Sequence, residues 1–234
     1  MLALSAIYGW DIQQMDIKGA YLNGDLEEEI YMIQPPEYDD NTGKVLLLIH
    51  SLYGLKQSGR AWYHKLKQVL LKHGFEQVTV EHCLYIRNRN GMLEVISAWV
   101  DDLLLFGPDP GSTLEIKTIL GREFEVHNLG EPHYLIGMEI NRDHCVGTIT
   151  LSQKQYIRKV LEKHQMSDLK SVTTPIDPNV VLLKWTKPPD DGKASHLYAT
   201  AIGSLMYAAI GSRPNIAFAV QTLSQFTQKP GPEH

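Results

Sequence analysis

Residues 83–107 read CLYIRNRNGMLEVISAWVDDLLLFG, and this stretch decides the fold class. Two runs typical of β-strands flank Asn90-Gly91, the dipeptide favoured in the two-residue type I′ turn of a hairpin. The second run ends at Asp101-Asp102, and the apolar run LLLF follows directly. A tight turn here would present both carboxylates at its tip. Burying such charges without partners costs on the order of several kcal/mol, so the pattern indicates carboxylates that bind cations or a metal ion.

The segments on either side of this hairpin alternate between strand-like and helix-like patterns. Before it we expect the end of a helix (2–10), a strand (12–17) and an exposed acidic turn (27–29). A strand stopped by two prolines (30–38), a buried strand (44–50) and a helix (59–74) should follow. After it we expect a helix capped by Ser112 (112–122), strands within 124–140 and at 147–151, and a helix capped by Ser152 (153–164). A proline-rich linker (167–195) and two helices (198–210 and 214–228) should follow. This succession predicts an α+β fold with an antiparallel sheet backed by helices.

Composition excludes several classes of protein. The chain has 234 residues, of which 43% are hydrophobic, so it can bury a core and is not expected to be disordered. Its two cysteines, Cys83 and Cys145, exclude a disulfide scaffold and a cysteine zinc site. No apolar stretch reaches 18 uncharged residues, so no membrane span is expected, and the N-terminal residues do not have the pattern of a signal peptide.

The net charge of −5 conceals two opposed blocks. Residues 1–40 hold nine acidic residues and one lysine, whereas residues 41–75 hold six basic residues and no acidic one. A smaller basic run lies in 154–163. These blocks are either ordinary solvated helix faces or a phosphate-facing surface beside a carboxylate cluster, as in a nucleic-acid groove.

Asp16 is a third candidate carboxylate, because it lies at the end of an apolar-flanked strand. Carboxylates on adjacent strands could bridge two divalent ions, an arrangement that activates a hydroxyl nucleophile and neutralises a leaving phosphate. The alternative is structural: Asp16 caps a turn, and Asp101-Asp102 is a solvated hairpin end.

Six ordered blocks carry a resemblance to a known family. They are MDIKGAYLNGDLEEEIYM (15–32), SLYGLKQSGRAWY (51–63), WVDDLLLFG (99–107), FEVHNLGEPHYLIGMEI (124–140), LSQKQYIRKVL (151–161) and YATAIGSLMYAAIGSRPNIAFAV (198–220). In this order and spacing the chain resembles the reverse transcriptase domain of copia-type LTR retrotransposon polyproteins. The resemblance implies an RNA-directed DNA polymerase that transfers nucleotides from dNTPs to a primer 3′-hydroxyl.

The resemblance also implies a catalytic centre. Asp16, Asp101 and Asp102 match the catalytic aspartates, which would bind two Mg²⁺ ions together with the backbone carbonyl of Ile17; Mn²⁺ could substitute. The partners implied are an RNA or DNA template, a primer strand and dNTPs, without a membrane. The oligomeric state stays open, and the expected location is intracellular, in a cytoplasmic particle or the nucleus.

Other residues receive roles only through the resemblance. Tyr21 matches the aromatic gate that excludes a ribose 2′-hydroxyl, with core packing as the alternative. Lys56, Gln57 and Arg60 match polar contacts to the nucleotide and template, with an ordinary basic helix start as the alternative. His127 stands where the family usually has Lys; it is either a proton donor to pyrophosphate or a surface histidine.

The fold implied is a polymerase palm with partial fingers and a helical thumb and connection. Residues 1–75 would form partial fingers and the first palm segment, 76–151 the palm with the catalytic hairpin, and 152–234 the thumb and connection. The resemblance further implies that upstream fingers strands and a downstream ribonuclease H domain lie outside this chain.

Two positions depart from the family pattern: Trp99 stands where Tyr is usual, and Gly59 where Pro is usual. Neither removes a carboxylate. They nevertheless leave a second hypothesis open, a catalytically inactive retroelement remnant that at most binds nucleic acid. A third hypothesis, an unrelated protein with a carboxylate hairpin, explains none of the ordered blocks.

Overall fold

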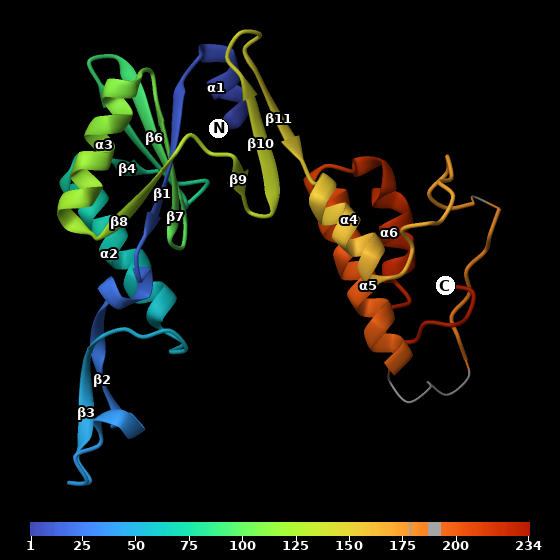
Figure 1. The fold of residues 1–234 in the computed structure, drawn as a ribbon, viewed down its shortest axis with the longest axis horizontal. Helices are drawn as coiled ribbons and strands as arrows, with labels where there is room; N and C mark the ends of the chain where they lie inside the picture. Colours follow the sequence, from blue (N-terminus) through green and yellow to red (C-terminus); the bar gives the residue numbers. More distant parts are fainter. Residues whose placement is uncertain (178, 187–192) are drawn as a thin grey trace. The chain divides into compact units, whose positions relative to one another are not determined.

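The computed structural model describes residues 1–177, 179–186 and 193–234. The chain forms two compact units, one of residues 1–132 and 144–148 and the other of 133–143 and 149–234. Figure 1 shows the elements of both units. In the described residues, no helix is long and apolar enough to span a bilayer.

A six-stranded antiparallel sheet forms the centre of the first unit, in the order β4-β5-β6-β7-β1-β8. Its strands are β1 (Asp11–Ile17), β4 (Glu76–Gln77), β5 (Leu84–Arg89), β6 (Met92–Trp99), β7 (Asp102–Gly107) and β8 (Val126–Gly130). The other elements of this unit are α1 (Leu2–Tyr8), η1 (Ala20–Asn23), β2 (Asp25–Ile33), η2 (Pro36–Tyr38), β3 (Val45–His50), α2 (Ser58–Lys72) and α3 (Pro110–Glu123). The mixture of helices and antiparallel sheet confirms the predicted α+β class.

The helices α2 and α3 cover one face of this sheet (Figure 1). Trp62 and Leu66 of α2 pack in one cluster with Leu103 of β7 and Met15 of β1, all nearly inaccessible to solvent. Because side chains alternate along a strand, the neighbours of Met15 and Leu103 point to the opposite face. Core packing therefore fixes which face presents Asp16 and its neighbours.

The hairpin of β5 and β6 has the predicted type I′ turn. Arg89 and Met92 are paired directly, and Asn90 and Gly91 have φ values of 51° and 81°. Both positive values are those that a type I′ turn requires, which explains the Asn-Gly dipeptide.

Two expectations for the segment before α2 are wrong. Residues 27–29 belong to β2, where the β2–β3 pairing is irregular between Asp25 and Ile30, so they do not form a separate turn. The strand at 44–50 exists as β3, but it is exposed: Ile49 retains 75% of its accessible surface. Among the described residues it pairs only with β2, in a two-stranded ribbon. A strand in such a ribbon has few neighbours to cover its apolar side chains.

The expected cap of α3 is also corrected. The cap is Asp109 rather than Ser112, since the Asp109 carboxylate accepts hydrogen bonds from the amides of Gly111 (2.8 Å) and Ser112 (3.1 Å). Pro110 then occupies the first helical position, where its missing N–H has no consequence.

The second unit combines a small sheet with helices. Its elements are β9 (Tyr134–Leu135), β10 (Met138–Asp143), β11 (Thr148–Ser152), α4 (Lys154–Lys163), α5 (Lys193–Gly211), η3 (Pro214–Ile216) and α6 (Ala217–Ser224). The expected cap of α4 is corrected by one residue: the N-cap is Gln153, whose side chain makes no capping hydrogen bond. Ser152 lies just before it, and its Oγ accepts a hydrogen bond from the amide of Lys154 (3.2 Å). The expected linker at 167–195 shows neither helix nor strand in its described residues up to 186, and its last residues belong to α5; residues 178 and 187–192 lie outside the described residues.

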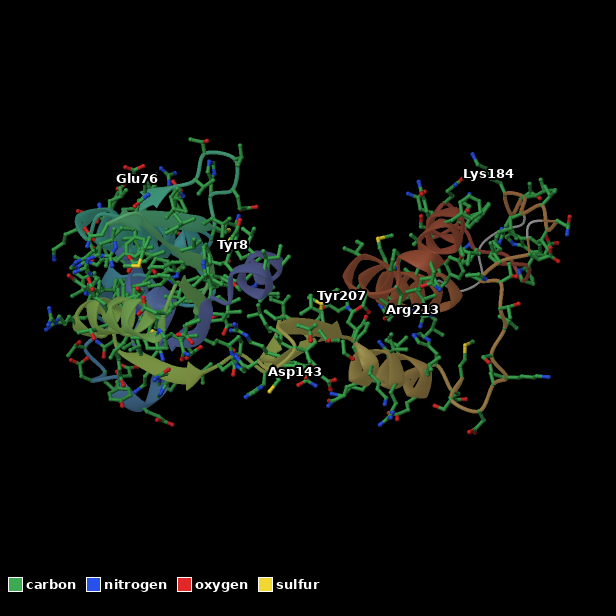
Figure 2. All side chains as sticks on the ribbon, turned by 90° about the horizontal axis from the view of Figure 1, so that it is seen from above. Tyr8, Glu76, Asp143, Lys184, Tyr207 and Arg213 are labelled. Carbon is green, nitrogen blue, oxygen red and sulfur yellow. The ribbon has the colours of Figure 1, made fainter. Side chains whose placement is uncertain are left out.

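Tyr207 of α5 links the helices of the second unit to the β9–β10 turn. Its hydroxyl donates a hydrogen bond to the carbonyl of Ile136, and its ring lies edge-on to Tyr156 of α4. Its side chain is labelled in Figure 2. Gln153 is buried and donates to the Tyr207 carbonyl (3.3 Å), so the start of α4 is fixed to the same residue.

Candidate active site

The turn between β6 and β7 presents two adjacent carboxylates. Trp99 and Asp102 are paired directly across the two strands, which leaves only Val100 and Asp101 in the turn. Val100 has a φ of 56°, which is a genuine outlier for a β-branched residue. Strained backbone of this kind is concentrated at functional sites. The predicted position of the acidic pair at the tip of a tight hairpin is therefore present in the structure.

Asp16 lies on the neighbouring strand, directly beside this turn. In the β1–β7 register, Asp16 is the partner of Asp102. The next residue, Ile17, donates its amide hydrogen to the Asp101 carbonyl at 2.8 Å. One strand and one turn thus bring together three carboxylates separated by about 85 residues in sequence.

A buried glutamine orients one of these carboxylates. Gln14 has 7% of its surface exposed, and its Nε2 donates to Oδ1 of Asp102 at 3.2 Å. Gln14 lies two residues before Asp16 on β1 and so shares its face of the sheet. No pattern in the sequence indicates this role of Gln14.

The electrostatics of the cluster disfavour three free negative charges. The pKa of Asp16 is raised, first by burial and then by the neighbouring negative charges of Asp101 and Asp102, while His127 acts in the opposite direction. Like charges on adjacent carboxylates raise a pKa because ionisation of one opposes ionisation of the next. A bound cation would relieve this repulsion.

His127 is placed beside the same carboxylate. It lies on β8 as the register partner of Asp16, and its side chain is exposed. This position agrees with either reading of the sequence, because an exposed histidine next to a reactive group can donate a proton or remain a solvated residue. Its role stays a prediction.

Two tyrosine rings lie next to the aspartates. Tyr21, in η1 directly after β1, has its ring centroid 4.8 Å from that of Tyr53. Burial, followed by the charges of Asp101 and Asp16 among other groups, raises the pKa of the Tyr53 hydroxyl. Tyr53 therefore remains protonated at neutral pH, close to the carboxylates. Sequence reasoning missed it at this site; its only signal was an aromatic residue among basic ones.

The three polar residues predicted to contact the nucleotide lie elsewhere on the same unit. Gln57 and Arg60, at the start of α2, line a pocket with Asp25 and other acidic residues of β2. Lys56 precedes them and is exposed. In the described part of the chain, no hydrogen bond or ion pair joins these three residues to the aspartate cluster. Their predicted roles remain untested.

The basic block at 41–75 is partly neutralised by neighbouring acidic residues. Lys65 pairs with Asp25 at 2.9 Å, and Lys72 pairs with Glu123 at 2.8 Å. Arg60 and Lys56 remain exposed, so the block offers fewer free cations than its sequence suggests.

The donor set suits a divalent cation by chemistry. Carboxylate oxygens are preferred by Mg²⁺, which completes its shell with water and phosphate oxygens rather than a full protein cage. Among the residues described, no group of three or more His, Cys, Asp or Glu side chains forms a ready-made metal site. The residue types therefore fit a metal held jointly with a substrate, and the side chains would adjust around it.

Comparison with known proteins identifies the family. The model of the family "Reverse transcriptase (RNA-dependent DNA polymerase)" matches residues 1–178. The chain belongs to this reverse transcriptase family. The family predicted from the ordered blocks is thereby confirmed, and five of the six blocks lie within the matched residues.

The similar proteins are retrotransposon polyproteins. The chain is 36% identical over its whole length to the retrovirus-related Pol polyprotein from transposon TNT 1-94 of Nicotiana tabacum, of which it covers 18%. It is also 36% identical, again over its whole length, to the retrovirus-related Pol polyprotein from transposon RE1 of Arabidopsis thaliana, of which it covers 16%. It is 32% identical, over 94% of its length, to 71% of a putative transposon Ty5-1 protein of Saccharomyces cerevisiae. This reverse transcriptase chain spans less than a fifth of the two plant polyproteins.

Proposed function

We propose that this chain is the polymerase part of a retrotransposon Pol polyprotein and extends a primer with dNTPs along an RNA or DNA template. The observation that carries the proposal is the pairing of Asp16 with Asp102 beside the Val100–Asp101 turn, in a chain of the reverse transcriptase family. A structural role for the three aspartates would not require them to converge.

The proposed metal ligands are Asp16, Asp101, Asp102 and the carbonyl of Ile17. Two Mg²⁺ ions bound there, or Mn²⁺ in their place, would activate the primer 3′-hydroxyl and neutralise the leaving pyrophosphate. The protein contributes the fixed register of β1 and β7, and the hydrogen bond from Gln14 that holds the Asp102 carboxylate. These contacts fix the backbone and one carboxylate, so only side-chain adjustment would be needed to bind the ions.

The residues around the cluster select and hold the nucleotide in this proposal. Tyr21 follows β1 directly and would exclude a ribose 2′-hydroxyl by its ring. Tyr53, protonated beside the carboxylates, can donate a hydrogen bond to a sugar or phosphate oxygen. Lys56, Gln57 and Arg60 would contact the nucleotide and template, and His127 would supply a proton to pyrophosphate.

In terms of polymerase architecture, residues 1–75 would supply partial fingers and the first palm segment, 76–151 the palm and 152–234 the thumb and connection. The first thumb helix would be α4, whose exposed basic residues can follow a nucleic-acid backbone; they are Lys154, Arg158, Lys159 and Lys163.

A primer-extension assay tests the proposal. Purified chain is incubated with a labelled DNA primer on an RNA template, dNTPs and Mg²⁺ or Mn²⁺, alongside Asp101→Asn. Asp168→Asn is the matched control, because Asp168 is an exposed aspartate of the second unit, outside the cluster. We expect extension by wild type and Asp168→Asn, and none by Asp101→Asn.

Equal signal from wild type and Asp101→Asn would refute the catalytic assignment. If all variants are inactive but bind the RNA–DNA hybrid with an affinity that falls steeply with salt, the alternative of a non-catalytic, nucleic-acid-binding remnant holds instead.

A further inference from the structure

The backbone of the β6–β7 turn has an unusual conformation for its sequence. Val100, which precedes Asp101 directly, has a φ of 56° in the left-handed region. A β-branched side chain disfavours this region strongly, so the surrounding structure has to hold the residue there. Val100 is 41% exposed, and burial of its side chain is therefore too limited to fix the turn.

A tryptophan of α2 supplies a hydrogen bond to this residue. The indole Nε1–H of Trp62 donates to the carbonyl oxygen of Val100 at 2.7 Å, across 38 positions of sequence. Trp62 is 3% exposed, and its ring meets Phe124 edge-on with centroids 5.1 Å apart. The ring is thus held in place by the core, and its single donor points at the turn.

The next carbonyl of the turn is held by the neighbouring strand β1. Ile17 of β1 donates its amide hydrogen to the Asp101 carbonyl at 2.8 Å. Two successive carbonyls are therefore fixed by donors from α2 and from the strand that carries Asp16. Together these two bonds fix the backbone position from which the Asp101 side chain extends.

Packing alone does not replace the tryptophan donor. A pocket lies beside the turn, and its lining includes Trp62, Tyr21, Tyr85, Ala98 and Val100. The open space leaves the turn room to relax toward an ordinary conformation once the hydrogen bond is lost. The hydrogen bond from Trp62 thus opposes relaxation of the strained Val100 backbone.

We propose that Trp62 is a positioning residue that holds the Val100–Asp101 turn, and thereby the Asp101 carboxylate, in its active placement. It acts through the backbone and does not touch substrate. The inference deepens the proposed polymerase function and depends on it for the consequence on catalysis, but its structural part can be measured without activity.

The test compares two substitutions that each remove one polar hydrogen donor from a buried ring. Trp62→Phe keeps an aromatic ring but removes the donor to Val100. Tyr85→Phe is the matched control, because Tyr85 is 1% exposed and lines the same pocket, while its hydroxyl contacts Gln77 rather than the turn. Hydrogen exchange of the Ile17 amide, measured by NMR on metal-free protein, reports on the turn directly.

We expect Trp62→Phe to accelerate exchange of the Ile17 amide by about tenfold, corresponding to loss of one buried hydrogen bond, and Tyr85→Phe to leave it within about twofold. In primer extension, Trp62→Phe should lower kcat by about tenfold with little change in the KM for dNTP. Equal acceleration by both substitutions, or none by Trp62→Phe, would overturn the inference.

A second substitution addresses the strain itself. Val100→Asn places at this position a residue that tolerates the left-handed region. We expect it to slow Ile17 exchange, and the effect of Trp62→Phe to shrink when measured in the Val100→Asn background, as a double-mutant cycle shows. If Trp62→Phe does not fold, Val100→Asn alone decides: slower exchange supports the inference, and unchanged or faster exchange contradicts it. An inactive wild type with the expected exchange pattern would refute the polymerase function and leave the positioning role intact.

Discussion

The metal-free carboxylate cluster should destabilise the protein, and Asp16→Asn should relieve this cost. The pKa of Asp16 is raised in the folded state by burial and by the charges of Asp101 and Asp102. A carboxyl group with a raised folded-state pKa favours folding most when it is protonated. Its contribution is therefore fully present below the unfolded value of about 3.9 and is lost as the pH rises through the folded-state pKa.

The register of the sheet sets the size of the effect. Directly opposed residues on adjacent strands, such as Asp16 and Asp102, have Cβ atoms about 5 Å apart. Two unit charges at about that distance repel by about 1 kcal/mol in water and by about 3 kcal/mol at an effective dielectric constant of about 20. Both carboxylates are partly exposed, so the lower figure applies. We expect Asp16→Asn to raise the free energy of unfolding by about 1 kcal/mol at pH 7.

Differential scanning fluorimetry in the presence of EDTA measures this change. A gain of about 1 kcal/mol corresponds to a rise in Tm of about 2–4 °C for a chain of this size. The gain should disappear below about pH 4, where wild-type Asp16 is itself protonated. Added Mn²⁺ should raise the Tm of wild type more than that of Asp16→Asn, because only wild type keeps the full set of charged ligands.

Asp25→Asn is the matched control, since the pKa of Asp25 is shifted in the other direction. A hydrogen bond from Lys65, assisted by the charges of Lys65 and His50, lowers it. Asp25→Asn should therefore leave the Tm unchanged or lower it slightly, because the pair is exposed. A fall in Tm for Asp16→Asn at pH 7, equal to or larger than that for Asp25→Asn, would refute the reasoning.

Three further predictions concern the gate, a buried ion pair and a helix cap. Tyr21→Ala should increase incorporation of ribonucleotides relative to deoxyribonucleotides in single-nucleotide extension, whereas Tyr31→Ala, on the exposed ribbon, should not; equal ratios would exclude the gate. Arg87→Met should lower stability in urea by about 3–5 kcal/mol because it leaves Glu94, whose side chain is 2% exposed, without its partner at 2.6 Å; the double substitution with Glu94→Met should lose less, and an equal loss would contradict this explanation. Asp109→Ala should cost about 1 kcal/mol in the same assay by removing the cap of α3, and no loss would show that the cap is redundant.

The sequence predicted the elements whose signals are local. The Asn90-Gly91 turn and the acidic tip of the next hairpin follow from dipeptide preference and from apolar flanks. The helix-like pattern at 59–74 predicted α2, whose buried face includes Trp62 and Leu66. In each case the deciding information lies within a few residues.

The sequence failed where neighbours in space decide the outcome. The apolar composition of β3 predicted burial, but a strand paired only with β2 leaves Ile49 exposed. The cap of α3 was misplaced by three residues because Pro110 marks the first helical turn and makes Asp109 the cap. Gln14 contacts Asp102, and Tyr53 comes within the electrostatic influence of Asp16 and Asp101, only through the fold, and no local pattern indicates either.

A kinetic cycle on two of the aspartates tests whether the carboxylates form one catalytic centre. The rate of single-nucleotide addition to a primer on an RNA template is measured for wild type, Asp16→Asn, Asp101→Asn and the double variant. If the carboxylates form one catalytic centre, each single substitution should lower the rate by at least about a thousandfold, and the double substitution should lower it no further. A wild-type rate no higher than that of the double variant would contradict the claim that these aspartates catalyse nucleotide transfer.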